Sequence, residues 1–132
     1  MEGSEIPVFI LSLILAADSW RRWYLGGRRP SWAGATGQAV MLGLAPLACF
    51  SGLFLVLRHL AASDVCNAPI YLLFYEVMGA AWIGAATYLM GWWGISMRDD
   101  AVERRNPAAG RALVGALLGV TFCFAGANVG NG

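Results

Sequence analysis

The sequence predicts an all-α, polytopic membrane protein with four transmembrane helices, and two observations support that prediction. Of its 132 residues, 58% are hydrophobic and 13% are charged, whereas a soluble domain carries about 25% charged residues. Four apolar stretches are each close to the roughly 20 residues that cross about 30 Å of hydrocarbon. Because lipid offers backbone groups no hydrogen-bond partner, and no stretch has the alternating pattern of a barrel strand, all four are predicted to be helices.

The four helices are expected to form a single integral-membrane domain that covers residues 1–132. They are predicted at about 6–25, 38–57, 68–97 and 108–129. The first stretch lacks a basic segment before it and a cleavage signal after it, so it is predicted to be a retained helix and not a signal peptide. The turn-like tail 128–132 has no charged anchor beyond it, so the chain is also compatible with a fragment of a longer protein.

Arginine residues predict the orientation of the helices, because basic residues in short loops stay in the cytoplasm. The middle connection has only Arg58, whereas the first and third connections are rich in arginine: Arg21, Arg22, Arg28, Arg29, Arg98, Arg104, Arg105 and Arg111. Five tryptophans, a residue that favours the headgroup level, lie near the same predicted boundary: Trp20, Trp23, Trp32, Trp92 and Trp93. We therefore expect a multi-pass protein of the bacterial inner membrane, surrounded by the lipid bilayer, with both termini on the periplasmic side.

The two halves of the chain resemble each other weakly. A shift of 76 positions aligns Arg28 and Arg29 with Arg104 and Arg105. After a gap of two residues, Cys49-Phe50-Ser51-Gly52 aligns with Cys123-Phe124-Ala125-Gly126. Two duplicated helical hairpins in parallel orientation would produce this pattern. A basic loop followed by a glycine-rich helix also produces it wherever a chain re-enters the membrane from the cytoplasm, so both interpretations stay open.

The start of the last helix carries a family resemblance. The segment Glu103-Arg104-Arg105-Asn106-Pro107-Ala108-Ala109-Gly110 precedes a span that contains Gly115, Gly119 and Gly126. This arrangement resembles the terminal helix of the YjfL-type family of small bacterial inner-membrane proteins. The resemblance covers about the last 30 residues. It implies a four-helix architecture and no particular activity, because the family has no established one.

Glu76 is the acidic residue that lies well inside a predicted span. At about 1.5 Å per residue it is about 10 Å from the outer end of the third helix. A carboxylate that faced lipid there would cost a few kcal/mol, so the side chain should face protein or water, or be protonated. The residues that share its helical face are mostly small: Gly79, Ala80, Ile83, Gly84 and Thr87. This face is therefore predicted to point into the bundle.

Three polar residues are expected in the same outer leaflet as Glu76, namely Arg58 and His59 at the end of the second helix and Asn128 at the end of the fourth. Arg58 is the first candidate for its partner. One interpretation makes the group an ion or proton site, since intramembrane carboxylates commonly serve that purpose. The other makes it a hydrogen bond between helices that fixes their register. The sequence leaves both open.

Glycines of the last two spans are predicted to mediate helix packing. Gly115 and Gly119 form one GxxxG pair and Gly126 and Gly130 form a second, on nearly one face of the helix. Such pairs let two helix backbones approach closely, within a chain or between chains. Together with Gly79 and Gly84 they form the set of predicted packing positions.

Several function classes are excluded or disfavoured. All nine basic residues are Arg, so lysine chemistry is impossible, and no catalytic motif is recognisable, so an enzyme is not expected. Asp18 is expected to pair with Arg21 and Arg22 at helical spacing. With a single His and three scattered Cys residues, neither a metal site nor another cofactor is predicted. No nucleic-acid partner is expected either.

Two functional hypotheses remain. In the first, the protein is a structural or accessory subunit, a helical bundle that forms homo-oligomers or associates with other membrane subunits through its glycine faces. In the second, several copies form a channel or transporter with Glu76 on the pathway. The first is favoured because a solute path needs several polar groups to replace hydration, and the predicted spans contain few.

Overall fold

The computed structural model describes residues 3–25, 37–96, 100–101, 103–104 and 106–130 as a bundle of antiparallel and parallel helices. The named elements are α1 (Glu5–Leu25), α2 (Gly37–Leu60), α3 (Ser63–Asn67), α4 (Pro69–Trp92) and α5 (Pro107–Ala127). Within the described ranges the regular structure is entirely helical, which confirms the all-α class. The helices α2, α4 and α5 are long and apolar enough to cross a membrane. Helix α1 is as long as α5 but carries Asp18, Arg21 and Arg22, and its membrane crossing stays a prediction.

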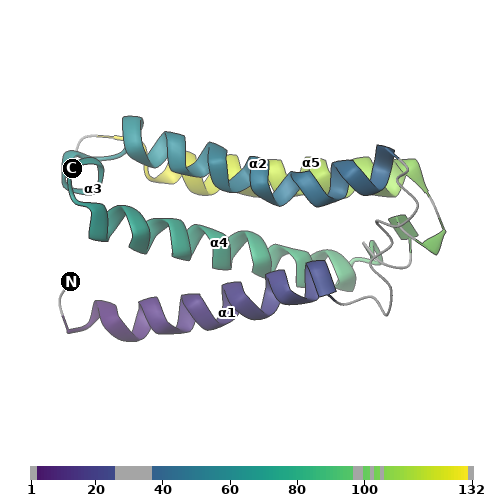
Figure 1. The fold of residues 1–132 in the computed structure, drawn as a ribbon, viewed down its shortest axis with the longest axis horizontal. Coiled ribbons are helices and arrows are strands. Elements are labelled where there is room, and N and C mark those ends of the chain that lie inside the picture. Colours follow the sequence, from purple (N-terminus) through teal and green to yellow (C-terminus); the bar gives the residue numbers. More distant parts are fainter. Residues whose placement is uncertain (1–2, 26–36, 97–99, 102, 105, 131–132) are drawn as a thin grey trace.

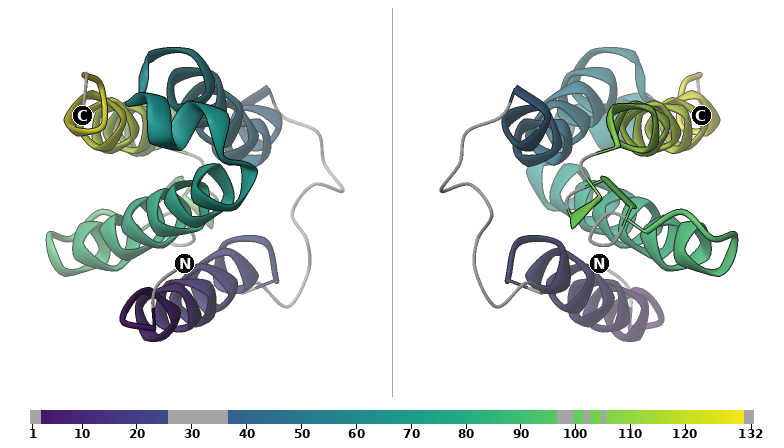
Figure 2. Two further views of the ribbon diagram at one scale, coloured as in Figure 1. Left: turned by 90° about the vertical axis from the view of Figure 1, so that its left-hand side faces the viewer. Right: turned by 90° about the vertical axis from the view of Figure 1, so that its right-hand side faces the viewer.

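The helices lie in three layers (Figure 1). Helices α2 and α5 lie side by side in one layer, α4 occupies the middle, and α1 covers the opposite side of α4 (Figure 2). Helices α1 and α4 run in one direction, and α2 and α5 run in the other. Any four helices connected end to end by short loops alternate in this way. The hairpin duplication therefore stays a prediction, and its residues Arg28 and Arg29 lie outside the described ranges.

The core lies between α4 and the α2–α5 layer. Its largest fully buried side chains come from all three helices: Leu42, Leu53, Leu57, Ile83, Leu113 and Leu117. Many other large apolar side chains are exposed, among them Leu11 and Ile14 of α1 and Trp82 of α4. Such exposure is expected for a chain whose solvent is lipid, because lipid tails are as apolar as leucine. Close fit, not apolarity, then decides which side chains form the core.

Helix α4 ends earlier than the sequence predicts. The expected helix 68–97 stops at Trp92, and residues 93–96 leave the helical path. Gly94 adopts a φ of 80°. The Ile95 N–H donates to the Met90 carbonyl at 3.1 Å and the Gly94 N–H donates to the Gly91 carbonyl at 3.2 Å. This is a Schellman cap, in which a glycine takes the left-handed position and satisfies the last carbonyls.

The start of α5 is fixed by a different cap. The Asn106 side chain accepts hydrogen bonds from the backbone N–H groups of Ala108 and Ala109, at 3.0 and 3.4 Å. Pro107 occupies the first turn, where its missing N–H costs nothing. The cap therefore explains why the segment around Asn106 is a helix entry, independently of any family resemblance.

Two of the five predicted belt tryptophans are directed into the bundle. The Trp23 ring is buried and its Nε1 donates to the Leu42 carbonyl at 3.3 Å. Trp20 donates from Nε1 to the Ala80 carbonyl at 3.0 Å. Trp92 and Trp93, by contrast, are 89% and 79% exposed at the same end of the bundle. Trp20 and Trp23 therefore face the bundle interior, because indole N–H groups near a helix interface find carbonyl acceptors there, and their depth in the membrane stays a prediction. Trp32 lies outside the described ranges.

Candidate functional site at Glu76

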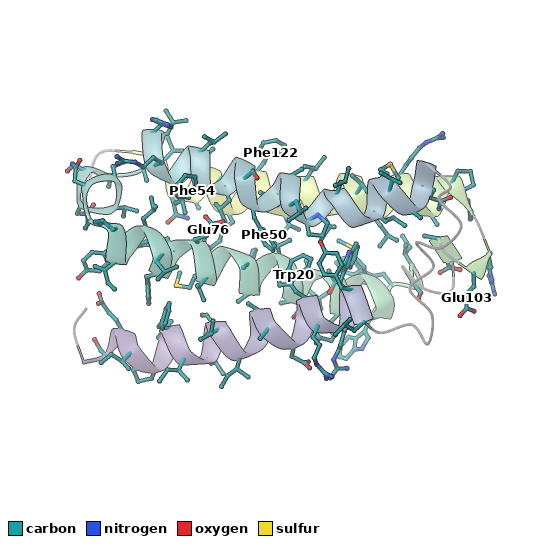
Figure 3. The ribbon with its side chains drawn as sticks, in the orientation of Figure 1. Trp20, Phe50, Phe54, Glu76, Glu103 and Phe122 are labelled. Carbon is teal, nitrogen blue, oxygen red and sulfur yellow. The ribbon has the colours of Figure 1, made fainter. Side chains whose placement is uncertain are left out.

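Glu76 lies on α4, two turns from its start at Pro69, and projects toward the α2–α5 layer (Figure 3). Its Oε2 atom is shielded from solvent and has no hydrogen-bond partner among the described residues. A buried polar atom without a partner is uncommon in native structures and calls for an explanation. This atom therefore marks Glu76 as the strongest candidate for a functional group in the bundle.

Apolar side chains surround the next turn of α4. A Cβ placed on Gly79 would overlap Leu53 Cδ2 of α2 and lie 3.0 Å from Phe124 Cε1 of α5. Because α2 and α5 run opposite to α4, the residues level with Glu76 lie one turn beyond these contacts, at Leu57 and Asn128. Leu57 is fully buried. On the α2 side the carboxyl group therefore faces an apolar side chain, while Glu76 as a whole is half-buried.

The predicted inward face of α4 contacts two different layers. Gly79 packs against α2 and α5, whereas a Cβ on Gly84 would meet Ser19 of α1, at 2.6 Å from its Cβ and 2.8 Å from its Oγ. Ile83 is fully buried between these contacts. The Thr87 hydroxyl donates to the Gly84 carbonyl of its own helix at 2.6 Å. The small residues thus let α4 be enclosed on both sides, with Glu76 on the α2–α5 side.

The three polar residues expected near Glu76 have other contacts. The Arg58 guanidinium donates to the Cys66 carbonyl and so braces the turn between α2 and α3. Asn128 donates from Nδ2 to the Phe124 carbonyl one turn back, at 2.7 Å. His59 is exposed at the end of α2. The fold brings all three to the same end of the bundle, but it does not bring a donor from any of them to Oε2 of Glu76.

A small cavity lies at this end of the bundle. It has a volume of about 230 Å³ and is lined by Arg58, Cys66, Asn67, Pro69 and Leu72. Leu72 lies one turn before Glu76, so the two side chains share one face of α4. The cavity therefore lies at the turn around α3, one helical turn from Glu76, and Glu76 itself does not line it.

A polar cluster at the other end of the bundle joins α1 to α4. The Tyr88 hydroxyl donates to Asp18 Oδ2 at 2.7 Å, and Arg22 Nε donates to the same atom at 2.8 Å. Arg21 contacts Asp18 Oδ1 at 3.3 Å, and the Arg22 guanidinium lies 5.5 Å from the centre of the Tyr88 ring. The helical spacing of the arginines predicts the two ion pairs. Tyr88 was not predictable, because sequence spacing says nothing about which tyrosine of α4 reaches α1.

The predicted packing glycines at the end of the chain have open space where a side chain would lie. Gly115, Gly119 and Gly126 are exposed, and a Cβ at each would meet nothing within 4 Å. Gly130 lies beyond the end of α5 with a φ of 144° and is likewise open. We call Gly115, Gly119 and Gly126 the outer glycine face. In the described residues it makes no helix–helix contact, so any packing role would require a second molecule.

No group of three His, Cys, Asp or Glu side chains in the described ranges is placed to hold a metal ion. Comparisons with protein-family models, with curated proteins and with solved structures found no match for this chain. The resemblance of residues 103–110 to the YjfL-type family stays a prediction. Any functional conclusion must therefore come from the geometry alone.

Proposed function

We propose that the protein is a polytopic membrane protein in which α1, α2, α4 and α5 all cross the bilayer, with both termini on the periplasmic side. Arginine distribution supports this topology. Arg21, Arg22, Arg104 and Arg111 lie at the end of the bundle where α1 and α4 finish, and Arg58 lies at the other end. Apart from Glu5 in its first turn, the charged residues of α1 lie in its last two turns, where long side chains reach the aqueous interface. The basic end then faces the cytoplasm.

In this membrane the protein acts as a structural subunit that self-associates through the outer glycine face. The observation that carries this proposal is the empty space above Gly115 and Gly119. Glycine in a helix interior costs about 1 kcal/mol relative to alanine. At the inward glycines, close contact with a neighbouring segment offsets this cost. At Gly115 and Gly119 no contact inside the chain offsets it. A second copy that packs α5 against α5 would supply one.

Cys123 provides the test, because it lies one turn after Gly119 on the same side of α5 and is exposed. Cys49 is buried and Cys66 is half-buried, so a variant with Cys49→Ala and Cys66→Ala retains a single exposed thiol. We expect mild oxidation of membranes that contain this variant to produce a disulfide-linked dimer. Adding Gly119→Leu should strongly reduce the dimer, because the larger side chain separates the helices.

A matched control is Gly52→Leu. Gly52 lies in α2 and also has open space at its Cβ, but it is not on the proposed interface, so dimer formation should persist. Equal loss of dimer in both variants, or no dimer in the starting variant, would contradict self-association through α5. A disulfide to a different membrane protein would instead indicate an accessory subunit of a larger complex.

A second candidate function is an oligomeric channel or transporter with Glu76 on the pathway. The partnerless Oε2 atom favours it. Purified protein in liposomes should then dissipate an imposed proton gradient, and Glu76→Gln should abolish that flux without altering the disulfide pattern of Cys123. Absence of flux in the wild-type protein would reject this candidate and leave the structural role in place.

A further inference from the structure

A charged carboxylate is poorly accommodated where Glu76 lies. Its Oε2 atom is buried without a donor, and the side chains that enclose the adjacent turn are Leu53 and Phe124. An ionised group needs hydrogen-bond donors or a counter-charge when it is removed from water. A neutral carboxylic acid needs no counter-charge, because its desolvation free energy is that of an ordinary polar group and is much smaller than that of an ion.

The charged groups of the neighbouring elements do not compensate for this. On α2 the nearest is Arg58, which is directed to the Cys66 carbonyl, and His59 is exposed. On α3 Asp64 is exposed. The described part of α5 carries Arg111 at its opposite end, and the Asp18 cluster of α1 lies beside Tyr88, three turns further along α4. At the Glu76 end of α1 the charged residue is Glu5, another acid, which supplies no counter-charge. Among the residues that the structure describes, Glu76 therefore has no ion-pair partner that could hold it in the charged form.

A cavity that can hold water lies at the α3 turn, one helical turn from Glu76. It is large enough to hold several water molecules, each of which occupies about 30 Å³, and it is lined by Leu72 on the same face of α4 as Glu76. Arg58 also lines it, so its positive charge disfavours metal cations in the cavity. A metal ion would in addition need several oxygen ligands, and Glu76 is a single carboxyl group.

We propose that Glu76 is a proton-binding site: it holds a proton as a neutral carboxylic acid and exchanges that proton with water through the cavity lined by Leu72 and Arg58. In the exchange the O–H bond of the acid breaks, the proton passes to a water molecule, and the carboxylate takes a proton back from water. The inference does not depend on self-association, and it does not require net transport across the membrane. It identifies the ligand of the site as a proton and its entrance as the α3 end of the bundle.

Infrared spectroscopy tests the protonation state directly. In detergent micelles near neutral pH, the wild-type protein should show a carboxylic-acid C=O band that Glu76→Gln removes. Glu103→Gln is the matched control, because Glu103 is exposed in the connection before α5, and this substitution should leave the band intact. Glu76→Asp keeps the acid and should move the band without abolishing it, which covers the case in which the Gln variant does not fold. A band that persists in folded Glu76→Gln, or its absence from the wild-type protein, would overturn the proposal.

Transfer into heavy water tests the entrance. The acid band should shift as its proton exchanges for deuterium. Leu72→Trp, which fills the cavity, should slow the exchange by about tenfold, equivalent to about 1.4 kcal/mol in the barrier. Leu73→Trp is the control, because the neighbouring side chain is exposed on another face of α4 and does not line the cavity. Equal exchange rates in the two variants would refute the cavity route.

Discussion

The glycines of this bundle include two sets that differ in what lies next to their Cα atoms. A Cβ on any inner glycine would collide with another helix or segment, and a Cβ on any outer glycine would meet open space. The inner set is Gly79, Gly84 and Gly110, and the outer set is Gly115, Gly119 and Gly126. Both sets occur in apolar helices of similar composition, so local sequence does not separate them.

The difference shows what holds such a bundle together. In lipid, apolar side chains gain little from leaving their solvent, so helix association depends on close packing and on hydrogen bonds between helices. Each inner glycine admits a neighbouring side chain: Leu53 at Gly79, Ser19 at Gly84 and Gln38 at Gly110. Gln38 then donates to the carbonyls of Ala101 and Asn106, at 2.9 Å each. At Gly110, therefore, close approach and hydrogen bonding between segments occur at the same place.

The largest expected effect is that of Gly79→Leu. The new side chain would occupy the space of Leu53, which is itself fully buried, so α4 and α2 must separate. We expect a loss of about 3 kcal/mol in the free energy of unfolding, at the upper end of typical overpacking costs. Unfolding in mixed micelles with increasing denaturing detergent would measure it. Gly119→Leu is the matched control and should change stability by about 1 kcal/mol or less; equal losses would abolish the distinction between inner and outer glycines.

Gly84→Ala should have an intermediate effect. The added methyl group meets the Cβ and Oγ of Ser19, and we expect a loss of about 1–2 kcal/mol as α1 moves away from α4. Ser19→Gly removes the opposing atoms. The double variant should therefore be more stable than the sum of the two single losses predicts, with a coupling free energy of about 1 kcal/mol. Strict additivity would show that the two positions are not in contact.

The smallest effect, and one of opposite sign, is expected for Gly119→Ala. Because nothing lies within 4 Å of the new Cβ, the substitution keeps all internal contacts and improves helix propensity. The dissociated chain should gain up to about 1 kcal/mol in stability. The free energy of unfolding should be measured at low protein concentration in detergent, where self-association through α5 does not contribute. A clear destabilisation there would mean that Gly119 packs within its own chain after all.

Much of the helix placement could be predicted from the sequence. The apolar stretches at 38–57 and 108–129 correspond to α2 and α5 within a few residues. The third helix was predicted too long, although the sequence contained the signal, because a glycine after the apolar run can take the left-handed cap position that Gly94 adopts. The short helix α3 was not predicted. Five residues with no apolar periodicity carry too little pattern to be recognised.

The surroundings of Glu76 could be predicted only in part. Helical spacing indicates that it shares a face with Gly79, and both lie on the α2–α5 side of α4. The expected partner Arg58 is at the correct end of the bundle but donates to the Cys66 carbonyl. Which acceptor an arginine reaches depends on the path of the turn around α3, and this path is set by contacts among residues distant in sequence.

The sequence by itself determined that most of this chain is apolar and that it forms helices, because composition and periodicity act locally along the chain. Only the tertiary structure decided which glycines have a neighbouring segment packed against them. It also decided that Trp20 and Trp23 donate hydrogen bonds to carbonyls inside the bundle, and that Glu76 has a buried oxygen without a donor among the described residues. In an apolar solvent every face of an apolar helix is equally acceptable. The choice among those faces is therefore made by shape and hydrogen bonding, which exist only once the helices have met.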